Sequence, residues 1–383
     1  MEGLLSSTPF AVMVAAVPPL QRFTTVDVGC SAGLDPAWRV FGAKLRAFGF
    51  DPNLAEVERL ARAEVMPGVR YVPAFVGVPD DLPFKRMRAE KGPWSRNPMD
   101  RLSAMRSLEL MRLGQLSEQE KTQANLWHDT GLADPDQPVI LRDFLPANGI
   151  HDVDVFKIDI DGLDLGVLQS VAAYLDKWQV LAVGLEVNYY GSDDDSDHTF
   201  HAMDRFMRSH GFDLFGLTVR RYSHTALPAP YTTGLPGPTV FGRPVQGDAL
   251  YLRDPCTAEL GLSLGPEKLL ALAAIASLAQ LPDFAAEILL RHRTSLENLI
   301  DLEKGLDLLA AQAQACSSAP LGYHEYIAAF ERGDPMFLHG GSVGAAAGAD
   351  NSDLYQRLLA MEASTSWRIT KPLRWLKRKF SGK

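Results

Sequence analysis

The chain has 383 residues, of which 46% are hydrophobic, so it is long enough for one large domain and a smaller one. Its net charge of −9 excludes nucleic acid as the main partner, because binding a polyanion requires a basic surface. The three cysteines, Cys30, Cys256 and Cys316, are too few and too widely spaced for a disulfide framework or a metal-ligand cluster. This cysteine usage is typical of a reducing cytoplasm.

An apolar stretch lies near the start of the sequence, at residues 9–20. Glu2 precedes it and no Lys or Arg does, so it does not read as a signal peptide. We interpret it as a buried helix within an N-terminal segment, 1–22. The other apolar run, 269–281, is too short to cross a bilayer, so no transmembrane span is predicted.

Residues 23–255 alternate short, β-branched segments with helical ones. This alternation predicts an α/β domain with a doubly wound, mostly parallel sheet. Two further strands, after a helix at 200–210, are expected to close the sheet edge. The predicted strands are 24–29, 44–50, 69–76, 153–160, 180–187, 212–219 and 249–252, and helices are predicted at 54–63 and 163–175.

The rest of the chain departs from this alternation. A polar insertion at 79–137, with a helix expected at 99–113, has a length typical of segments that cover a site. Leu and Ala at helical spacing, with Pro282 separating two helices, predict a C-terminal helical appendage over 256–335. A glycine-rich linker, 336–350, and a basic tail, 351–383, then follow.

The first predicted strand runs into the sequence VDVGCSAG, residues 26–33. Gly29 and Gly33 allow a ligand to approach the backbone closely. The spacing G-x-x-x-G lacks the middle glycine of a dinucleotide-binding turn, which disfavours a nicotinamide enzyme. Asp51, in GFDPN after the second strand, is placed to accept both hydroxyls of a ribose. The alternative is that Asp51 only caps the helix near Asn53 and the glycines only form a turn.

These two segments, together with KIDIDGLDLGVLQ at 157–169, resemble the FkbM methyltransferases over about residues 22–253. Members of that family O-methylate sugars and natural products. The resemblance implies a Rossmann-like class I methyltransferase fold and S-adenosylmethionine as cofactor. The family usually has a glutamate where this chain has Asp161. The residues that the resemblance and the motif assign to cofactor binding are Asp27, Gly29, Cys30, Ser31, Gly33, Asp51 and Pro52, with Cys30 expected to be a small packing residue rather than a nucleophile.

Lys157, Asp159 and Asp161 end a predicted strand, where ligands of open α/β sheets bind. Methyl transfer to an alcohol requires alignment of the acceptor and either a base or a metal, so a divalent ion stays open although no metal ligands are assigned. Asp159 or Asp161 is predicted to face the acceptor hydroxyl as general base or hydrogen-bond anchor, with Lys157 setting the local potential. The alternative is that Lys157 pairs with one carboxylate and the other caps the next helix.

Glu186 is a second catalytic candidate. It is an isolated carboxylate in the apolar run VGLEVNYYG, where burial is costly unless the group is paired or used. The loop that follows, 191–201, departs from a calcium-binding pattern because His198 stands where glycine is required. His198 and His201 are interpreted as solvated side chains at a helix start rather than ligands.

The tail at 364–380 reads STSWRITKPLRWLKRKF and interleaves aromatic and basic residues. This pattern suits an anionic membrane surface. The tail also resembles C-terminal segments of bacterial cell-surface polysaccharide glycosyltransferases. It is predicted to dock the protein to the inner membrane or to a polysaccharide-assembly complex, the alternative being a disordered tail or a helix packed on the acidic body.

Together these features predict a cytoplasmic O-methyltransferase, peripheral at the inner membrane, that acts on a sugar hydroxyl of a bacterial surface polysaccharide or its precursor. The acceptor would lie under the 79–137 insertion. One alternative acceptor is a small natural product or lipid. A non-enzyme alternative is a membrane-docked adaptor of a glycan-assembly complex with a degenerate cofactor pocket.

Overall fold

The computed structural model divides into two compact units, residues 1–309 and 310–383. It describes residues 3–82, 133–134, 136–160, 162–175, 180–189, 198–222, 243–257, 264–314, 317 and 319–338. Most of the predicted insertion, including the helix at 99–113, lies outside these ranges. So do Asp161 and the tail. The predicted domain boundaries stay predictions.

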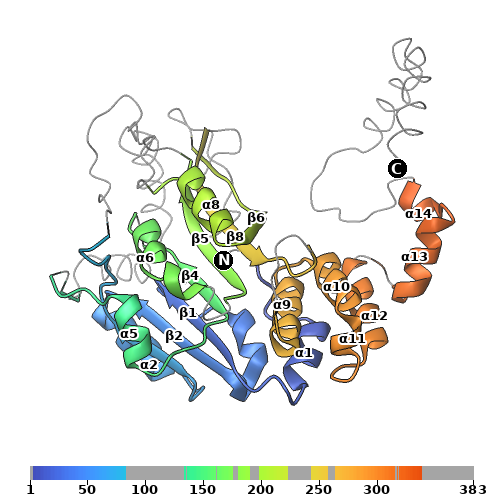
Figure 1. Ribbon diagram of the computed structural model, residues 1–383, viewed down its shortest axis with the longest axis horizontal. Coiled ribbons are helices and arrows are strands. Elements are labelled where there is room, and N and C mark those ends of the chain that lie inside the picture. Colours follow the sequence, from blue (N-terminus) through green and yellow to red (C-terminus); the bar gives the residue numbers. More distant parts are fainter. Residues whose placement is uncertain are drawn as a thin grey trace, which may run out of the picture. The chain divides into compact units, whose positions relative to one another are not determined.

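Within the described residues, eight strands form one sheet in the first unit, with the order β3-β2-β1-β4-β5-β8-β6 and β7 paired to β8 (Figure 1). Strands β1 to β5 are parallel, whereas β8 runs antiparallel to its neighbours β5, β6 and β7. The strands are β1 (Phe23–Val28), β2 (Leu45–Asp51), β3 (Val69–Pro73), β4 (Val155–Ile158), β5 (Ala182–Asn188), β6 (Phe212–Leu217), β7 (Arg220–Tyr222) and β8 (Arg243–Arg253).

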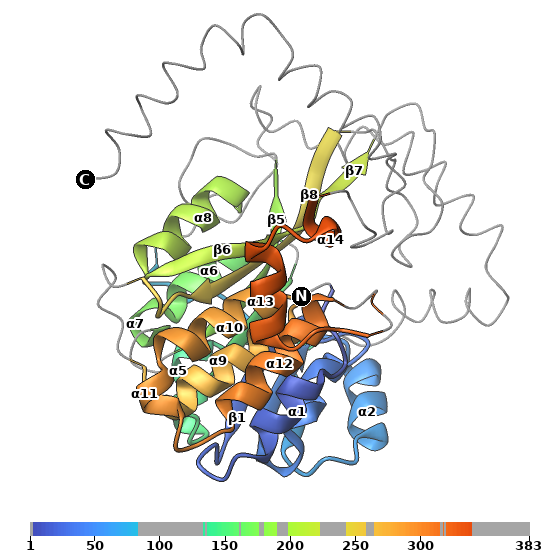
Figure 2. The same cartoon turned by 90° about the vertical axis from the view of Figure 1, so that its right-hand side faces the viewer.

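Helices cover both faces of this sheet. Alternate residues of β5, such as Val183 and Leu185, join a buried cluster with α6 and α8. The residues between them, such as Gly184 and Glu186, therefore face the other side. Figure 2 shows α6, α7 and α8 apart from α1 and α2. The helices on the face of the sheet to which Val183 and Leu185 point are α5 (Leu141–Ala147), α6 (Asp164–Ser170), α7 (Ala172–Leu175) and α8 (Phe200–Ser209). The first unit also contains α1 (Pro9–Ala16), the 3-10 helix η1 (Pro36–Lys44) and α2 (Leu54–Ala63).

The doubly wound, mostly parallel sheet predicted from the alternation is therefore confirmed. The strand order reverses between β1 and β4, because β2 and β3 follow on one side and β5 on the other. In open α/β sheets such a reversal leaves a crevice at the carboxyl ends of the strands, which is where ligands bind. The residues predicted for the site come from those strand ends.

Helix α9 (Pro266–Leu278) is buried along most of its length and packs against α1. The hydroxyl groups of Thr8 and Ser277 lie 2.7 Å apart in a buried hydrogen bond between the two segments. Lys268 Nζ donates to Asp152 and Asp154, each at 2.7 Å, and so ties α9 to the chain entering β4. The first residues of the predicted appendage are thus fastened to the sheet domain.

The remaining helices follow α9 in the chain. Pro282 begins α10 (Pro282–Arg291), as expected for the first turn of a helix, and α11 (Arg293–Leu296) and α12 (Leu302–Ala313) come next. In the second unit α13 (Tyr323–Glu331) and α14 (Pro335–Leu338) share aromatic contacts, with the rings of Phe330 and Phe337 5.3 Å apart. No helix in the described part of the chain is long and apolar enough to cross a membrane.

Candidate functional site

The turn after β1 is held tightly against the neighbouring strands. Gly29 has a φ of +81°, and a Cβ atom there would lie 1.9 Å from the carbonyl oxygen of Asp159. The backbone N–H groups of Gly29 and Cys30 both donate to the carbonyl of Phe50, at 2.9 and 3.1 Å. Gly33, with a φ of +99°, ends the turn. The first glycine of the motif is therefore required both by conformation and by the approach of β4.

Lys157 lies at the centre of the predicted site. Its Nζ donates to the carbonyl of Gly29 at 2.6 Å and lies 3.3 Å from carboxylate oxygens of both Asp27 and Asp159. Burial opposes the charge of Lys157, but the two carboxylates raise the pKa of its ammonium group. Burial raises the pKa of Asp27, and the charge of Lys157 opposes that rise. Lys157 thus fastens the turn after β1 to the end of β4.

Asp51 is the last residue of β2 and is buried. Its Oδ1 accepts from the backbone N–H of Asn53 at 2.9 Å, and the Asn53 side chain in turn caps α2. Burial raises the pKa of Asp51. Asn53 rather than Asp51 therefore supplies the side-chain cap of α2, and Asp51 holds the backbone of the turn before that helix. Pro52 follows directly.

Two side chains of the VDVGCSAG turn are buried in different ways. The Ser31 hydroxyl is buried and has no hydrogen-bond partner among the described residues, which is costly unless a ligand or water supplies one. The Cys30 thiol packs against β2, since a Cβ atom on Gly49 would lie 2.8 Å from its Sγ. Burial and the charges of Asp27 and Asp51 raise the pKa of the Cys30 thiol, which disfavours the thiolate form that a nucleophile requires.

A polar chain that the sequence did not reveal supports the far side of the turn. The hydroxyl of Tyr71 accepts from the backbone N–H of Leu34 at 3.3 Å and donates to Glu64 at 3.4 Å. Arg39 binds Glu64 through two hydrogen bonds of 3.0 and 2.8 Å and lowers the pKa of that carboxyl to about 2. Arg39 is in η1, Glu64 follows α2 and Tyr71 is in β3, so no local spacing in the sequence could have connected them.

The end of β4 holds the acceptor-side candidates. The side chain of Asp159 is 39% exposed and is paired with Lys157, as one of the alternatives predicted. Asp164, the first residue of α6, accepts from the backbone N–H groups of Ile160 and Gly162, both at 3.0 Å, and so fixes the turn after Asp159. The sequence did not single out Asp164. The predicted role of Asp161 stays a prediction because that residue is outside the described ranges.

Glu186 has the partner that its burial requires. Its Oε1 accepts from Arg220 at 3.1 Å and from Gln246 at 2.9 Å, and Arg220 also binds Asp248 at 2.7 Å. Glu186 and Asp248 are opposite each other on β5 and β8. The structure thus places Glu186 in a network that joins the antiparallel strands, and its catalytic role stays a prediction.

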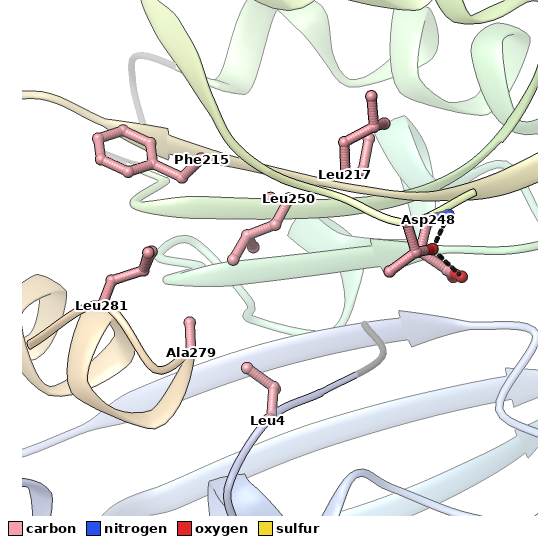
Figure 3. Close-up of a pocket in the computed structure, with 10 residues that line it drawn as sticks. Leu4, Phe215, Leu217, Asp248, Leu250, Ala279 and Leu281 are labelled. Atoms are coloured by element: carbon pink, nitrogen blue, oxygen red, sulfur yellow. Dashed lines mark hydrogen bonds between the residues drawn. The ribbon is translucent and has the colours of Figure 1, made fainter. Parts of the chain in front are cut away.

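A small pocket of about 80 Å³ lies between β6, β8 and the connection from α9 to α10 (Figure 3). Apolar side chains such as Phe215, Leu250 and Leu281 line it, with Asp248 at one end. None of the predicted site residues lines this pocket, so it is separate from the turn after β1. No group of three or more His, Cys, Asp or Glu side chains within the described ranges could hold a metal ion.

Comparison with known protein families gives a match to the part of the chain that contains β4 and β5. The sequence model of the methyltransferase FkbM domain matches residues 117–214. Residues 117–214 are therefore similar to the methyltransferase FkbM domain. This match confirms the resemblance deduced from KIDIDGLDLGVLQ, and it contains Lys157, Asp159 and Glu186. The turn at 26–33 and Asp51 lie before the matched residues.

Solved structures give distant similarities only. A putative S-adenosylmethionine-dependent methyltransferase from Listeria monocytogenes is 10% identical, with 62% of this chain and 93% of that chain covered and a TM-score of 0.31. The magnesium protoporphyrin IX methyltransferase of Synechocystis PCC 6803, solved with bound SAM, is 9% identical over 63% of this chain and 76% of that one, with a TM-score of 0.27. No curated protein matches the chain.

Proposed function

We propose that this methyltransferase uses S-adenosylmethionine to methylate a hydroxyl oxygen, and that the cofactor binds at the carboxyl ends of β1 and β2. The buried hydroxyl of Ser31, in the turn after β1, is the observation that carries this proposal, because it has no hydrogen-bond partner among the described residues and a bound ligand would supply one. Asp51, a buried carboxylate at the end of β2, is the group that we propose accepts the ribose hydroxyls. When bound, the cofactor supplies a methyl group on a sulfonium.

The chain's own residues divide into a cofactor side and an acceptor side. Asp27, Gly29, Ser31, Gly33 and Asp51 form the cofactor side. Lys157 connects the two sides, since it contacts the Gly29 carbonyl and the Asp159 carboxylate at once. Asp159 is then an anchor for the acceptor hydroxyl rather than its base, because a carboxylate paired with an ammonium group is a weak base.

The acceptor that we propose is a sugar hydroxyl of a bacterial surface polysaccharide or its precursor. The support is the family resemblance, whose members O-methylate sugars. A small natural product or a lipid is the second candidate acceptor. The two candidates are distinguished by an assay with methyl-tritiated S-adenosylmethionine and a panel of monosaccharides, nucleotide sugars, phenols and lipids. Label on sugars supports the proposal, and label only on phenols or lipids refutes the sugar acceptor.

Replacing Asp159 by Asn is expected to lower kcat at least about 100-fold with the best acceptor of the panel, while S-adenosylhomocysteine affinity stays within about twofold. The reason is that Asp159 is the accessible carboxylate at the end of β4, whereas the cofactor contacts lie on β1 and β2. Asp213→Asn is the matched control, because Asp213 is a half-exposed carboxylate of β6 in a long ion pair with Arg208. Undiminished turnover in Asp159→Asn would remove Asp159 from the acceptor side.

We also propose that the basic tail docks the protein to an anionic membrane surface. Residues 364–383 contain seven basic and no acidic residues, and each basic residue near such a surface contributes roughly 1 kcal/mol. Truncation after Ala363 is expected to abolish cosedimentation with phosphatidylglycerol vesicles at low salt. Equal sedimentation of the truncated and full chains would count against docking through the tail.

A further inference from the structure

A buried aspartate and histidine meet where the chain leaves β4 and β5. His198 immediately precedes Thr199, the N-cap of α8, and Asp164 begins α6. His198 Nδ1 lies 3.5 Å from Asp164 Oδ2, and both side chains are fully buried. The sequence had suggested a solvated His198, and that interpretation is wrong. Both residues follow parallel strands on the ligand-binding edge of the sheet.

The carboxylate of Asp164 faces Nδ1 of the imidazole ring at ion-pair distance. This carboxylate is itself held by the backbone N–H groups of Ile160 and Gly162. Burial raises the pKa of Asp164, and the charge of His198 opposes that rise. With Nδ1 facing a carboxylate, the neutral ring is expected to keep its proton on Nδ1 and to leave a lone pair on Nε2.

Both ring nitrogens of His198 are buried and have no hydrogen-bond partner among the residues that the structure describes. Nδ1 faces the carboxylate of Asp164 at 3.5 Å, so Nε2 is the nitrogen that remains for a ligand. An unsatisfied buried nitrogen costs about 1–3 kcal/mol, so a ligand hydroxyl that donates to it would gain that interaction. An acceptor alcohol is such a ligand.

We propose that His198, oriented by Asp164, is the general base of methyl transfer, an inference that rests on the proposed function. As the acceptor oxygen bonds to the methyl carbon and the sulfonium–carbon bond breaks, the hydroxyl proton moves to Nε2. The sulfonium becomes a neutral thioether, and the imidazolium formed is stabilised by Asp164. An imidazole suits this role better than Asp159, because Asp159 is paired with Lys157.

Few other charged groups act on this pair within the described ranges. Asp164 faces the ring from α6, and Asp159, at the end of β4, adds a negative charge that acts on Asp164. On α8 itself, His201 Nε2 lies 3.3 Å from the hydroxyl of Thr199. His201 is therefore a histidine of the same helix start with a different partner, which makes it a matched control.

The test compares full-length wild type with His198→Asn, Asp164→Asn and the control His201→Asn. With the best acceptor of the panel, His198→Asn is expected to lower kcat at least about 100-fold and to remove the rise of kcat with pH that deprotonation of a base gives. S-adenosylhomocysteine affinity, measured by calorimetry, should change less than about twofold and shows that the variants fold. His201→Asn should keep wild-type kcat.

A second readout needs no acceptor. In protein labelled with ¹⁵N-histidine, the NMR signals of His198, assigned by their loss in His198→Asn, should show the proton on Nδ1 in wild type and a change of tautomer in Asp164→Asn. A proton on Nε2 in wild type, or full kcat in His198→Asn, would overturn the inference. If the panel gives no product while S-adenosylhomocysteine binds, the acceptor proposal fails and the NMR result still decides the state of the pair.

Discussion

Replacing Gly29 by alanine is expected to destabilise the protein by about 3 kcal/mol or more and to abolish S-adenosylhomocysteine binding. Two effects add. A left-handed φ of +81° costs a non-glycine residue about 1–3 kcal/mol. The new Cβ atom would also lie 1.9 Å from the Asp159 carbonyl oxygen, so the turn and the end of β4 must move apart. Urea unfolding measures the loss of stability, and titration calorimetry measures the loss of S-adenosylhomocysteine binding.

Gly149 provides the control for this substitution. Its φ is +66°, and a Cβ atom there would meet nothing within 4 Å. Gly149→Ala should therefore show the conformational cost alone, about 1 kcal/mol, with unchanged ligand affinity. Equal losses of stability in the two variants, with ligand binding retained by Gly29→Ala, would show that contact between the turn and β4 does not shape the site.

Replacing Lys157 by methionine is expected to lower the free energy of unfolding by about 3–5 kcal/mol at pH 7, because it leaves the buried carboxylate of Asp27 without its counter-charge. It should also weaken S-adenosylhomocysteine binding at least about tenfold, since the Gly29 carbonyl loses its donor. The pKa of Asp27 is already raised by burial, and the loss of Lys157 raises it further. Urea unfolding of wild type and Lys157→Met at several pH values measures the loss of free energy of unfolding.

The stability that Lys157→Met loses relative to wild type is expected to increase with pH. A folded-state pKa of Asp27 above the unfolded value means that the folded protein binds more protons, so stability falls as the pH rises between the two values. The deficit against wild type should be small near pH 4 and should grow toward neutral pH. Adding Asp27→Asn to the variant should recover most of the stability at pH 7, and a pH-independent deficit would contradict the buried ion pair.

Lys268→Met separates a structural loss from a loss of ligand binding. Lys268 also binds two carboxylates, Asp152 and Asp154, but at the opposite end of β4. Its loss should reduce stability and leave S-adenosylhomocysteine affinity within about twofold. If both lysine variants lose affinity equally, Lys157 acts only through global stability.

The parts of the fold that depend on local pattern were predictable from the sequence. The strands β1 and β2 and the helix α2 lie within one or two residues of their predicted positions, because β-branched runs and helical spacing mark them. The helix η1 was missed. It is a 3-10 segment interrupted at Gly42, where φ is +54°, so it shows no 3.6-residue periodicity.

The position of the candidate residues at strand ends was predictable, but their contacts with one another were not. Lys157 was expected to set the local potential, which stays a prediction, and the structure brings it into contact with Gly29, 128 positions earlier. The pairing of Glu186 with Arg220 and that of Asp164 with His198 join residues 34 positions apart, and only the arrangement of the strands brings them together. A sequence read by spacing has no signal for such contacts.

Titration calorimetry of the purified protein with S-adenosylmethionine and S-adenosylhomocysteine tests the cofactor site most directly, with Asp51→Ala measured alongside. Asp51 is buried at the end of β2, with one oxygen on the Asn53 amide. The proposed site predicts binding of both ligands in the micromolar range and a loss of at least about tenfold in the variant, which corresponds to about 1.4 kcal/mol. Failure of wild type to bind either ligand would contradict the methyltransferase proposal and favour an adaptor, and equal binding by wild type and Asp51→Ala would place the cofactor elsewhere.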